Sequence, residues 1–206
     1  MYSFETDLLK KGYKFIAGVD EVGRGPLAGP VVAAAVILNP DIFIDGLNDS
    51  KKLSDKKRRE LSTKIKSNCL AYSITYIEPN EIDKINIYQA SKKAMIVSIL
   101  SLDVQPDFVL SDAMPLNEIS IPFDSIIKGD SKSASIAAAS IIAKVERDDY
   151  MIGLGLKHPE YGFEQHKGYP TKKHVQALND YGVLDCHRKT YKPVYDVIHR
   201  QVKFKI

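Results

Sequence analysis

The sequence predicts an α/β fold in which a mixed β-sheet is flanked by helices and followed by a helical C-terminal part. Two observations favour this fold. Short apolar, β-branched runs alternate with longer segments of helical periodicity, in the order strand, strand, helix, strand, helix, strand, strand, helix. The remainder, from about residue 152 to residue 206, is aromatic and basic and has helical patterning. We expect residues 1–206 to form a single domain, with this remainder as its C-terminal extension.

The first two strands are expected over residues 15–22 and 30–38, after a short lead-in helix or turn over residues 1–14. The first strand reaches two adjacent carboxylates, Asp20 and Glu21. Acids at the end of a buried strand are costly unless something pairs with them, and a divalent cation is the obvious partner.

The next elements have local signals of their own. Ser54 is a good N-cap for a helix over Asp55–Ser67, in which Leu61 and Ile65 lie four residues apart on the inner face. Leu70–Ile77 alternates large apolar residues with smaller or polar ones, which is typical of a strand. The later elements are expected, in chain order, to be a short helix from Pro79, a helix over Ile87–Leu102, short strands over Asp107–Leu110 and Ser125–Ile127, and helices over Ser133–Tyr150 and Lys172–Tyr181.

Carboxylates recur after these strands. Asp20 and Glu21 come at the end of the first strand, Asp112 after the fourth and Asp130 after the fifth. If the strands are neighbours, the four acids converge, and carboxylate oxygens suit Mg²⁺ or Mn²⁺. Two such ions about 4 Å apart serve phosphodiester cleavage in other enzymes. The residues alone predict a metal-dependent phosphoryl-transfer enzyme; the alternative is that each acid is an ordinary surface or turn residue.

The composition narrows the class of protein. A net charge of +3 with clustered Lys and Arg is compatible with a polyanion partner. Cys69 and Cys186 are far apart in sequence, which argues against a zinc ribbon or a disulfide framework and fits a reducing cytosol. The N-terminus lacks an apolar signal core, and no window approaches the roughly 20 apolar residues that span a bilayer. We expect a cytoplasmic monomer that does not enter the membrane.

Five sequence blocks span nearly the whole chain: Asp20–Pro30, Leu47–Leu53, Lys128–Ser131, Ala137–Asp148 and Tyr161–Thr171. In content and order they resemble the signature blocks of bacterial type 2 ribonuclease H, also called ribonuclease HII. The resemblance implies a ribonuclease H-like fold and an endonuclease that hydrolyses the RNA strand of RNA–DNA hybrids. It also implies nicking of DNA on the 5′ side of embedded ribonucleotides, 3′-hydroxyl and 5′-phosphate products, and a role in ribonucleotide removal.

The resemblance also assigns roles to residues. The metal-binding catalytic acids, which hold two Mn²⁺ or Mg²⁺ ions in the family, match Asp20, Glu21, Asp112 and Asp130. The motif that reads the ribose 2′-hydroxyl through its backbone matches Gly23, Arg24 and Gly25. Tyr169 matches the tyrosine that packs on the neighbouring deoxyribose at the RNA–DNA junction. We expect an in-line attack by activated water, without a covalent enzyme intermediate.

One departure from the family pattern is visible. The family commonly has glycine after its third acid, whereas Ala113 follows Asp112 here. Basic residues expected to contact phosphates, and so to position the duplex without reading sequence, are Lys51, Lys52, Lys144 and Arg188. His166 either orients a phosphate or caps a turn, and we expect structural roles for His158, His174, His187 and His199.

Three other functions compete with this interpretation. A structure-selective DNA nuclease of the same fold would not need the Gly-Arg-Gly turn and Tyr169, and it would cut all-DNA substrates. A non-catalytic RNA–DNA binding module would tolerate loss of the acids, yet this chain has all four. A kinase-like phosphate-binding domain would carry a Gly-x-x-x-x-Gly-Lys-Ser/Thr loop, which the sequence lacks.

Overall fold

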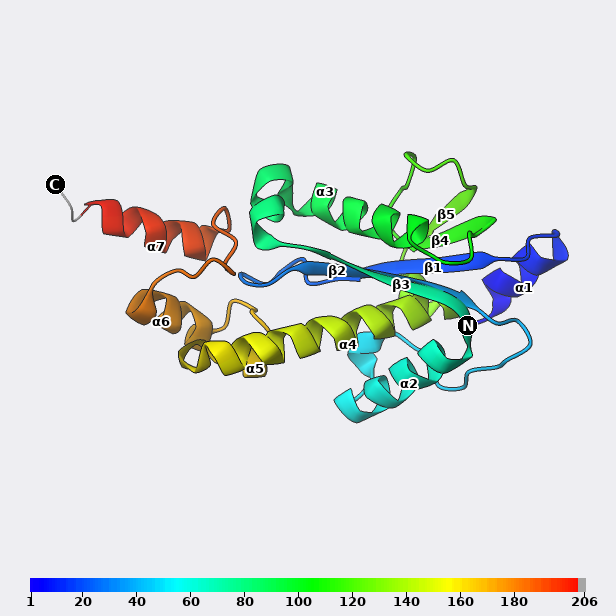
Figure 1. The fold of residues 1–206 in the computed structure, drawn as a ribbon, viewed down its shortest axis with the longest axis horizontal. Coiled ribbons are helices and arrows are strands. Elements are labelled where there is room, and N and C mark those ends of the chain that lie inside the picture. Colours follow the sequence, from blue (N-terminus) through cyan, green and yellow to red (C-terminus); the bar gives the residue numbers. More distant parts are fainter. Residues whose placement is uncertain (204–206) are drawn as a thin grey trace. The chain divides into compact units, whose positions relative to one another are not determined.

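The computed structural model describes residues 1–203 (Figure 1). Its strands are β1 (Ile16–Val22), β2 (Val31–Leu38), β3 (Cys69–Ile77), β4 (Phe108–Asp112) and β5 (Phe123–Ile126). Its α-helices are α1 (Ser3–Lys10), α2 (Asp55–Asn68), α3 (Pro79–Leu100), α4 (Ala134–Lys157), α5 (Phe163–His166), α6 (Lys172–Tyr181) and α7 (Lys192–Lys203). Three short 3₁₀ helices complete the list: η1 (Ser50–Lys52), η2 (Gly129–Ser131) and η3 (Pro159–Tyr161).

The five strands form one sheet in the order β3-β2-β1-β4-β5. β1 pairs antiparallel with β2 and parallel with β4, and β4 pairs parallel with β5. The predicted mixed sheet with flanking and C-terminal helices is therefore confirmed. None of the helices within residues 1–203 is both long and apolar enough to cross a membrane.

Two compact units make up the described chain. We call the first the sheet unit; it contains Met1–Val22, Val32–Tyr76 and Ser91–Val145. We call the second the loop unit; it contains Gly23–Val31, Ile77–Ala90 and the described residues from Glu146 onward. The expectation of a single domain over residues 1–206 stays a prediction.

The core of the sheet unit depends on small side chains in α4. Residues Ala137, Ala138 and Ala139 are fully buried and pack with β2 and α2. On β1, a Cβ atom built at Gly18 would lie 2.0 Å from the backbone carbon of Ser135, so only glycine permits this approach of helix to strand. Figure 1 shows α2 and α4 on one face of the sheet and α3 on the other.

Most predicted elements are present, and several of their ends differ from the expectation by one to seven residues. α4 continues to Lys157, beyond the expected end at Tyr150. The expected break between a helix from Pro79 and a helix from Ile87 is confirmed within α3: Asn86 has a φ of 66° and a ψ of 164°, which are not helical. α7 was expected only as part of a helical C-terminal region. The Ser54 side chain caps α2 as predicted, by accepting the N–H of Lys57.

Candidate active site

Strand register brings two of the predicted acids together. β1 and β4 run parallel, and Val19 aligns with Ser111, so Asp20 and Asp112 follow at neighbouring positions on adjacent strands. The carboxyl ends of parallel strands meet at one edge of a sheet, which is where α/β folds place their sites. Asp20 is buried, with 6% of its surface exposed.

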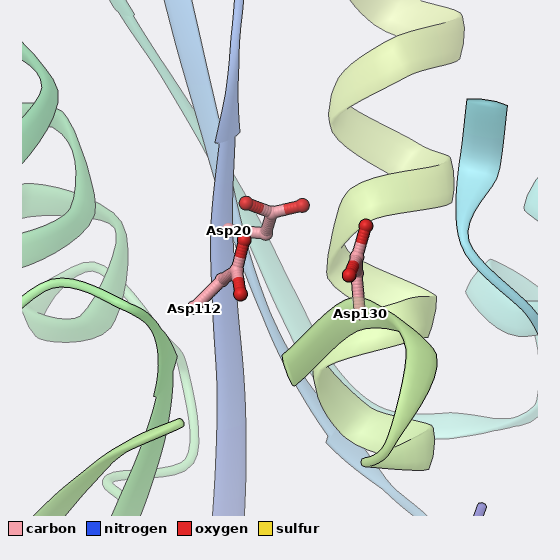
Figure 2. A group of neighbouring side chains, drawn as sticks. All are labelled: Asp20, Asp112 and Asp130. Carbon is pink, nitrogen blue, oxygen red and sulfur yellow. The ribbon is translucent and has the colours of Figure 1, made fainter. Parts of the chain in front are cut away.

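The third acid comes from the short helix η2 that follows β5. Asp130 is buried and faces Asp20 and Asp112 (Figure 2). The N–H of Gly129 donates to Asp112 Oδ1 at 2.7 Å, which fixes this turn against the end of β4. One carboxylate oxygen from each of Asp20, Asp112 and Asp130 lies within 4.8 Å of the other two. The sheet unit thus assembles three oxygen ligands around one point.

The electrostatics of this group fit a cation. Burial, and then repulsion by Glu21 and Asp112, raises the pKa of Asp20 well above its usual range. Burial and the neighbouring Asp112 and Asp49 likewise raise the pKa of Asp130. A divalent cation among these oxygens would relieve both the repulsion and the lost hydration. The donor set contains only carboxylates, as hard cations such as Mg²⁺ and Mn²⁺ prefer.

Glu21 is not part of this three-carboxylate group. It follows Asp20 on β1, and successive side chains of a strand point to opposite faces. Its N–H donates to Asp20 Oδ1 at 2.7 Å, and its charge is the second largest cause of the raised pKa of Asp20. The role that the resemblance implies for Glu21 as a metal ligand stays a prediction.

The sequence reasoning missed two polar residues beside the acids. Ser140 on α4 hydrogen-bonds to Asp20 and also to the hydroxyl of Ser50 at 3.0 Å. Asp49, the N-cap of η1, accepts the N–H of Lys51 and shares a hydrogen bond with Asp130. Both lie inside motif blocks, which is the only signal that could have indicated them.

A hollow of about 500 Å³ opens beside these acids. Its charged lining residues are Asp49, Lys51, Lys52, Asp112, Lys128 and Asp130. Positively charged lysine side chains thus line the same hollow as the acids, as the binding of phosphate groups requires. Lys144 lies on α4 outside this lining, so its predicted phosphate contact gains no support here.

The backbone after the third acid shows why glycine is common at the position that Ala113 occupies here. Ala113 has a φ of 51°, in the left-handed region that glycine adopts without steric cost. Its N–H donates to the carbonyl of Ile126 at 3.1 Å, so β5 holds the turn in place. Alanine is accommodated here at a steric cost of roughly 1–2 kcal/mol.

Replacing Ala113 with Gly should therefore stabilise the protein. The relief of left-handed strain exceeds the extra entropy that glycine brings to the unfolded chain, so we expect a gain of about 0.5–1 kcal/mol in the free energy of unfolding. Urea titration measures it. Ala94→Gly, in the regular part of α3, is the control and should lose about 1 kcal/mol or more; an Ala113→Gly variant that loses as much would contradict the explanation.

In the loop unit, two buried arginines hold the backbone between Gly23 and Pro30. Arg188 donates to the carbonyl oxygens of Gly23 (2.6 Å), Arg24 (2.9 Å) and Gly29 (2.9 and 3.1 Å). Arg147 donates to three more carbonyls at 3.0–3.1 Å, those of Ala28, Pro30 and Lys167. Arg188 therefore fixes the backbone of Gly23 and Arg24, which the resemblance assigns to reading the 2′-hydroxyl, and Arg147 fixes the residues that follow them.

The geometry of Arg188 does not fit its predicted phosphate contact. The side chain is fully buried, and each guanidinium nitrogen donates to a carbonyl or to the hydroxyl of Tyr191. A guanidinium surrounded by backbone carbonyls has no donor left for a phosphate. We therefore replace the predicted phosphate contact of Arg188 with a role in positioning the turn. No sequence pattern distinguishes such an arginine from one that faces solvent.

The structure brings two of the predicted substrate-reading residues together. A Cβ atom at Gly25 would lie 3.6 Å from Cε1 of Tyr169, so the ring of Tyr169 borders the turn. Tyr169 is 41% exposed. The backbone just before it is held in place, because the carbonyl of Gly168 accepts the N–H of Leu27 at 2.8 Å. An exposed ring on a fixed backbone is what contact with a sugar requires.

The loop unit also contains buried histidines. His174 and His187 are 0% and 1% exposed, and their Nε2 atoms are 3.1 Å apart. Burial lowers the pKa of His174 to about 4 and that of His187 to about 3. Both imidazoles are therefore neutral at pH 7.

This burial predicts loss of stability in mild acid. The unfolded chain binds protons at these histidines below pH 6.5 and the folded chain does not, so the free energy of unfolding falls as pH decreases. At pH 5 the loss should be about 2 kcal/mol per histidine. The raised pKa of Asp20 has the opposite effect, because it increases the free energy of unfolding as pH falls. The contribution of His174 is therefore isolated by comparing urea titrations of wild type and His174→Asn at pH 7 and pH 5. An unchanged difference between the two proteins would refute the prediction.

Comparison with known proteins places the chain in a family. A family model described as ribonuclease HII matches residues 17–194. Ribonuclease HII of Bacillus mycoides (strain KBAB4) is 55% identical over 200 residues, covering 97% of this chain and 77% of that protein. Ribonuclease HII of Bacillus cereus (strain AH820) gives the same values.

Solved structures agree with the sequence relatives. Ribonuclease H2 from Pyrococcus horikoshii OT3 is 27% identical, with a TM-score of 0.80 over 92% of this chain and 100% of that one. Ribonuclease HII from Archaeoglobus fulgidus, solved in a complex with PCNA, is 29% identical, with a TM-score of 0.74 over 86% of this chain and 95% of that one. The resemblance inferred from the five sequence blocks is confirmed. The chain therefore belongs to the ribonuclease HII family, and it is a metal-dependent ribonuclease H, an endonuclease acting on RNA–DNA hybrids.

Proposed function

We propose that this chain cleaves the phosphodiester on the 5′ side of a ribonucleotide, in hybrids and in DNA with embedded ribonucleotides, leaving 3′-hydroxyl and 5′-phosphate ends. The observation that carries the proposal is the group Asp20, Asp112 and Asp130, in which Asp20 and Asp130 are buried and one oxygen of each residue lies within 4.8 Å of the others. Removal of ribonucleotides from DNA is the role that follows from this activity.

The three aspartates, with Glu21 beside them, are the residues that would hold Mg²⁺ or Mn²⁺, and we propose two such ions. Bound there, the ions would supply Lewis acidity toward the phosphodiester and lower the pKa of water. The protein's own residues keep the ligands in place: Ser140 orients Asp20, and the N–H of Gly129 orients Asp112. Lys51 and Lys52 at the adjacent hollow are placed to contact substrate phosphates.

Substrate choice is proposed to depend on the Gly-Arg-Gly turn and Tyr169. RNA differs from DNA at a nucleotide by the 2′-hydroxyl, which both donates and accepts hydrogen bonds. A rigid backbone turn around Gly23, Arg24 and Gly25 penalises a sugar without this group, because its own polar atoms stay unpaired. Tyr169, next to Gly25, would pack on the following deoxyribose and so mark the RNA–DNA junction.

The test uses a DNA duplex with one ribonucleotide, an all-DNA duplex and a uniform hybrid, each with Mg²⁺, Mn²⁺ or a chelator. We expect a metal-dependent nick 5′ of the ribonucleotide and no cleavage of all-DNA. Cleavage of both DNA duplexes would favour a structure-selective nuclease, and binding without cleavage would favour a binding module. A monomeric state and a cytoplasmic location stay predictions; sedimentation of the purified chain tests the first.

A further inference from the structure

Three histidines of the loop unit, His166, His174 and His187, form a cluster that contacts the backbone of the turn at Gly168 and Tyr169. His166 stacks on His174, with ring centroids 4.6 Å apart and planes at 13°. His174 in turn contacts His187 through the two Nε2 atoms, 3.1 Å apart. Phe163 packs against all three rings. The proposed chemistry uses none of these imidazoles, yet each makes specific polar contacts.

The contacts determine where each proton lies. The N–H of Leu184 donates to His187 Nδ1 at 3.0 Å, so the proton of the neutral His187 ring is on Nε2. It points to Nε2 of His174, which must accept it and so carries its own proton on Nδ1. His174 Nδ1 lies 3.0 Å from the carbonyl oxygen of Tyr169, which can only accept. The assignment is the same when it is started from the Tyr169 end.

A second histidine fixes the preceding residue of the turn. The N–H of Gly168 donates to His166 Nδ1 at 3.2 Å, and His166 Nε2 donates to the carbonyl of Tyr161 at 2.8 Å. Burial lowers the pKa of His166 as it does for the other two; the charge of Lys173 also lowers it, and the charge of Glu164 raises it. The neutral form keeps both donor and acceptor in place.

The turn itself is backbone that needs such support. Lys167 and Gly168 have φ values of 51° and 81°, and left-handed backbone at Lys167 is unfavourable for a residue with a side chain. Tyr169 follows with an exposed ring, while its carbonyl accepts from both His174 and the N–H of Thr171. The histidines therefore bind the backbone and leave the ring free for substrate.

We propose that the directional chain from Leu184 N–H through His187 and His174 to the Tyr169 carbonyl, called here the histidine relay, is a positioning device for RNA–DNA junction recognition. It sets the orientation of the Tyr169 ring without touching the substrate. The inference rests on the proposed role of Tyr169. It goes beyond a structural role, because it makes junction preference depend on which imidazole nitrogen carries the proton.

The proton positions are tested first, without reference to activity. Long-range ¹H–¹⁵N correlation spectra of the wild-type protein at pH 7 should show His174 as the Nδ1–H tautomer and His187 as the Nε2–H tautomer. An Nε2–H tautomer at His174 would overturn the relay.

Matched variants then test its effect on recognition. An asparagine amide takes the place of the histidine Nδ1 and a glutamine amide that of Nε2, so His174→Asn keeps the donor to Tyr169 and His174→Gln loses it. The measured quantity is kcat/KM on the single-ribonucleotide duplex divided by that on the uniform hybrid. We expect this ratio to fall about fivefold in His174→Gln, the value of one neutral hydrogen bond, and to be kept in His174→Asn. His199→Gln, at an exposed site of α7, is the control for the substitution itself.

Tyr169→Ala is measured in the same assay to separate the two proposals. If Tyr169→Ala leaves the ratio unchanged, the proposed role of Tyr169 is wrong. If Tyr169→Ala lowers the ratio but both His174 variants keep it, the tyrosine role stands and the relay is refuted. Equal losses in both His174 variants, with equal melting temperatures, would also refute the relay, because they would show dependence on ring packing alone.

Discussion

Replacing Asp20 with Asn will reduce metal-dependent cleavage of an RNA–DNA hybrid by about a thousandfold, since charge stabilisation at such a site contributes several kcal/mol and each 1.4 kcal/mol is tenfold in rate. Asp20 is the most buried of the three grouped acids, and one of its oxygens lies within 4.8 Å of those of Asp112 and Asp130. Burial, and then repulsion by Glu21 and Asp112, raises its pKa. The amide removes the charge without changing the shape of the side chain.

The same substitution should stabilise the protein in the presence of a chelator. Without a cation, the folded state must keep Asp20 buried beside Glu21 and Asp112, and this repulsion is absent in the unfolded chain. An Asn oxygen can still accept the N–H of Glu21, and its amide can still meet Ser140. A cation should reverse the order, stabilising the wild type far more than the variant.

Thermal melts with chelator, Mg²⁺ and Mn²⁺, together with initial rates on the hybrid, measure both effects. Asp103→Asn, at an exposed site outside the carboxylate group, is the matched control and should change neither. A variant that is inactive and also less stable in chelator would indicate a damaged fold rather than a lost ligand. Wild-type cleavage rates in Asp20→Asn would exclude the aspartates as the metal site.

The acids and the sheet could be predicted because their signals are local. The run that ends at Asp20 is apolar, and the short strands before Asp112 and Asp130 show the same pattern. What the pattern cannot give is register: only the pairing of Val19 with Ser111 places Asp20 beside Asp112. For the same reason the sequence could not show that Glu21, one residue further along β1, lies outside the three-carboxylate group.

The errors have physical causes of their own. Arg188 was expected at a phosphate because arginine is rarely buried. No local pattern indicates its four hydrogen bonds to carbonyls that are distant in sequence, those of Gly23, Arg24 and Gly29. The end of α4 was placed too early because Gly153 and Gly155 weaken helix propensity. Gly155 is instead needed for packing, because a Cβ atom there would meet the backbone N of Glu164 at 2.8 Å.

A second large effect, on stability and substrate selectivity, is expected at the turn after β1. Its two glycines, Gly23 and Gly25, differ sharply in the space available for a side chain. Gly23 has a φ of 97°, and a Cβ atom there would lie 2.1 Å from Nε of the buried Arg147 and 2.9 Å from the carbonyl oxygen of Pro30. Gly25 has no such constraint, and a Cβ atom there meets only Cε1 of Tyr169 at an ordinary 3.6 Å. The two positions are two residues apart and are both assigned to reading the 2′-hydroxyl.

Gly23→Ala should cost at least about 3 kcal/mol of unfolding free energy, because left-handed strain adds to the loss of buried hydrogen bonds from Arg147. Arg147 cannot move aside without leaving the carbonyls of Ala28, Pro30 and Lys167 unpaired. Gly25→Ala should stay within about 0.5 kcal/mol of wild type. Urea titration of both variants gives these values.

The pair separates support of the turn from reading of the substrate. If the turn reads the 2′-hydroxyl, Gly25→Ala should lose selectivity for the ribonucleotide duplex over all-DNA while its stability stays normal, because its methyl group occupies the space beside Tyr169. Gly23→Ala should lose both selectivity and stability, because displacing Arg147 releases the carbonyls of Ala28, Pro30 and Lys167 that support the turn. If Gly23→Ala were as stable as wild type, Arg147 would be free to move, and the rigidity proposed for the turn would be wrong. If Gly25→Ala kept full selectivity, discrimination would have to come from elsewhere than the surface that Gly25 and Tyr169 share.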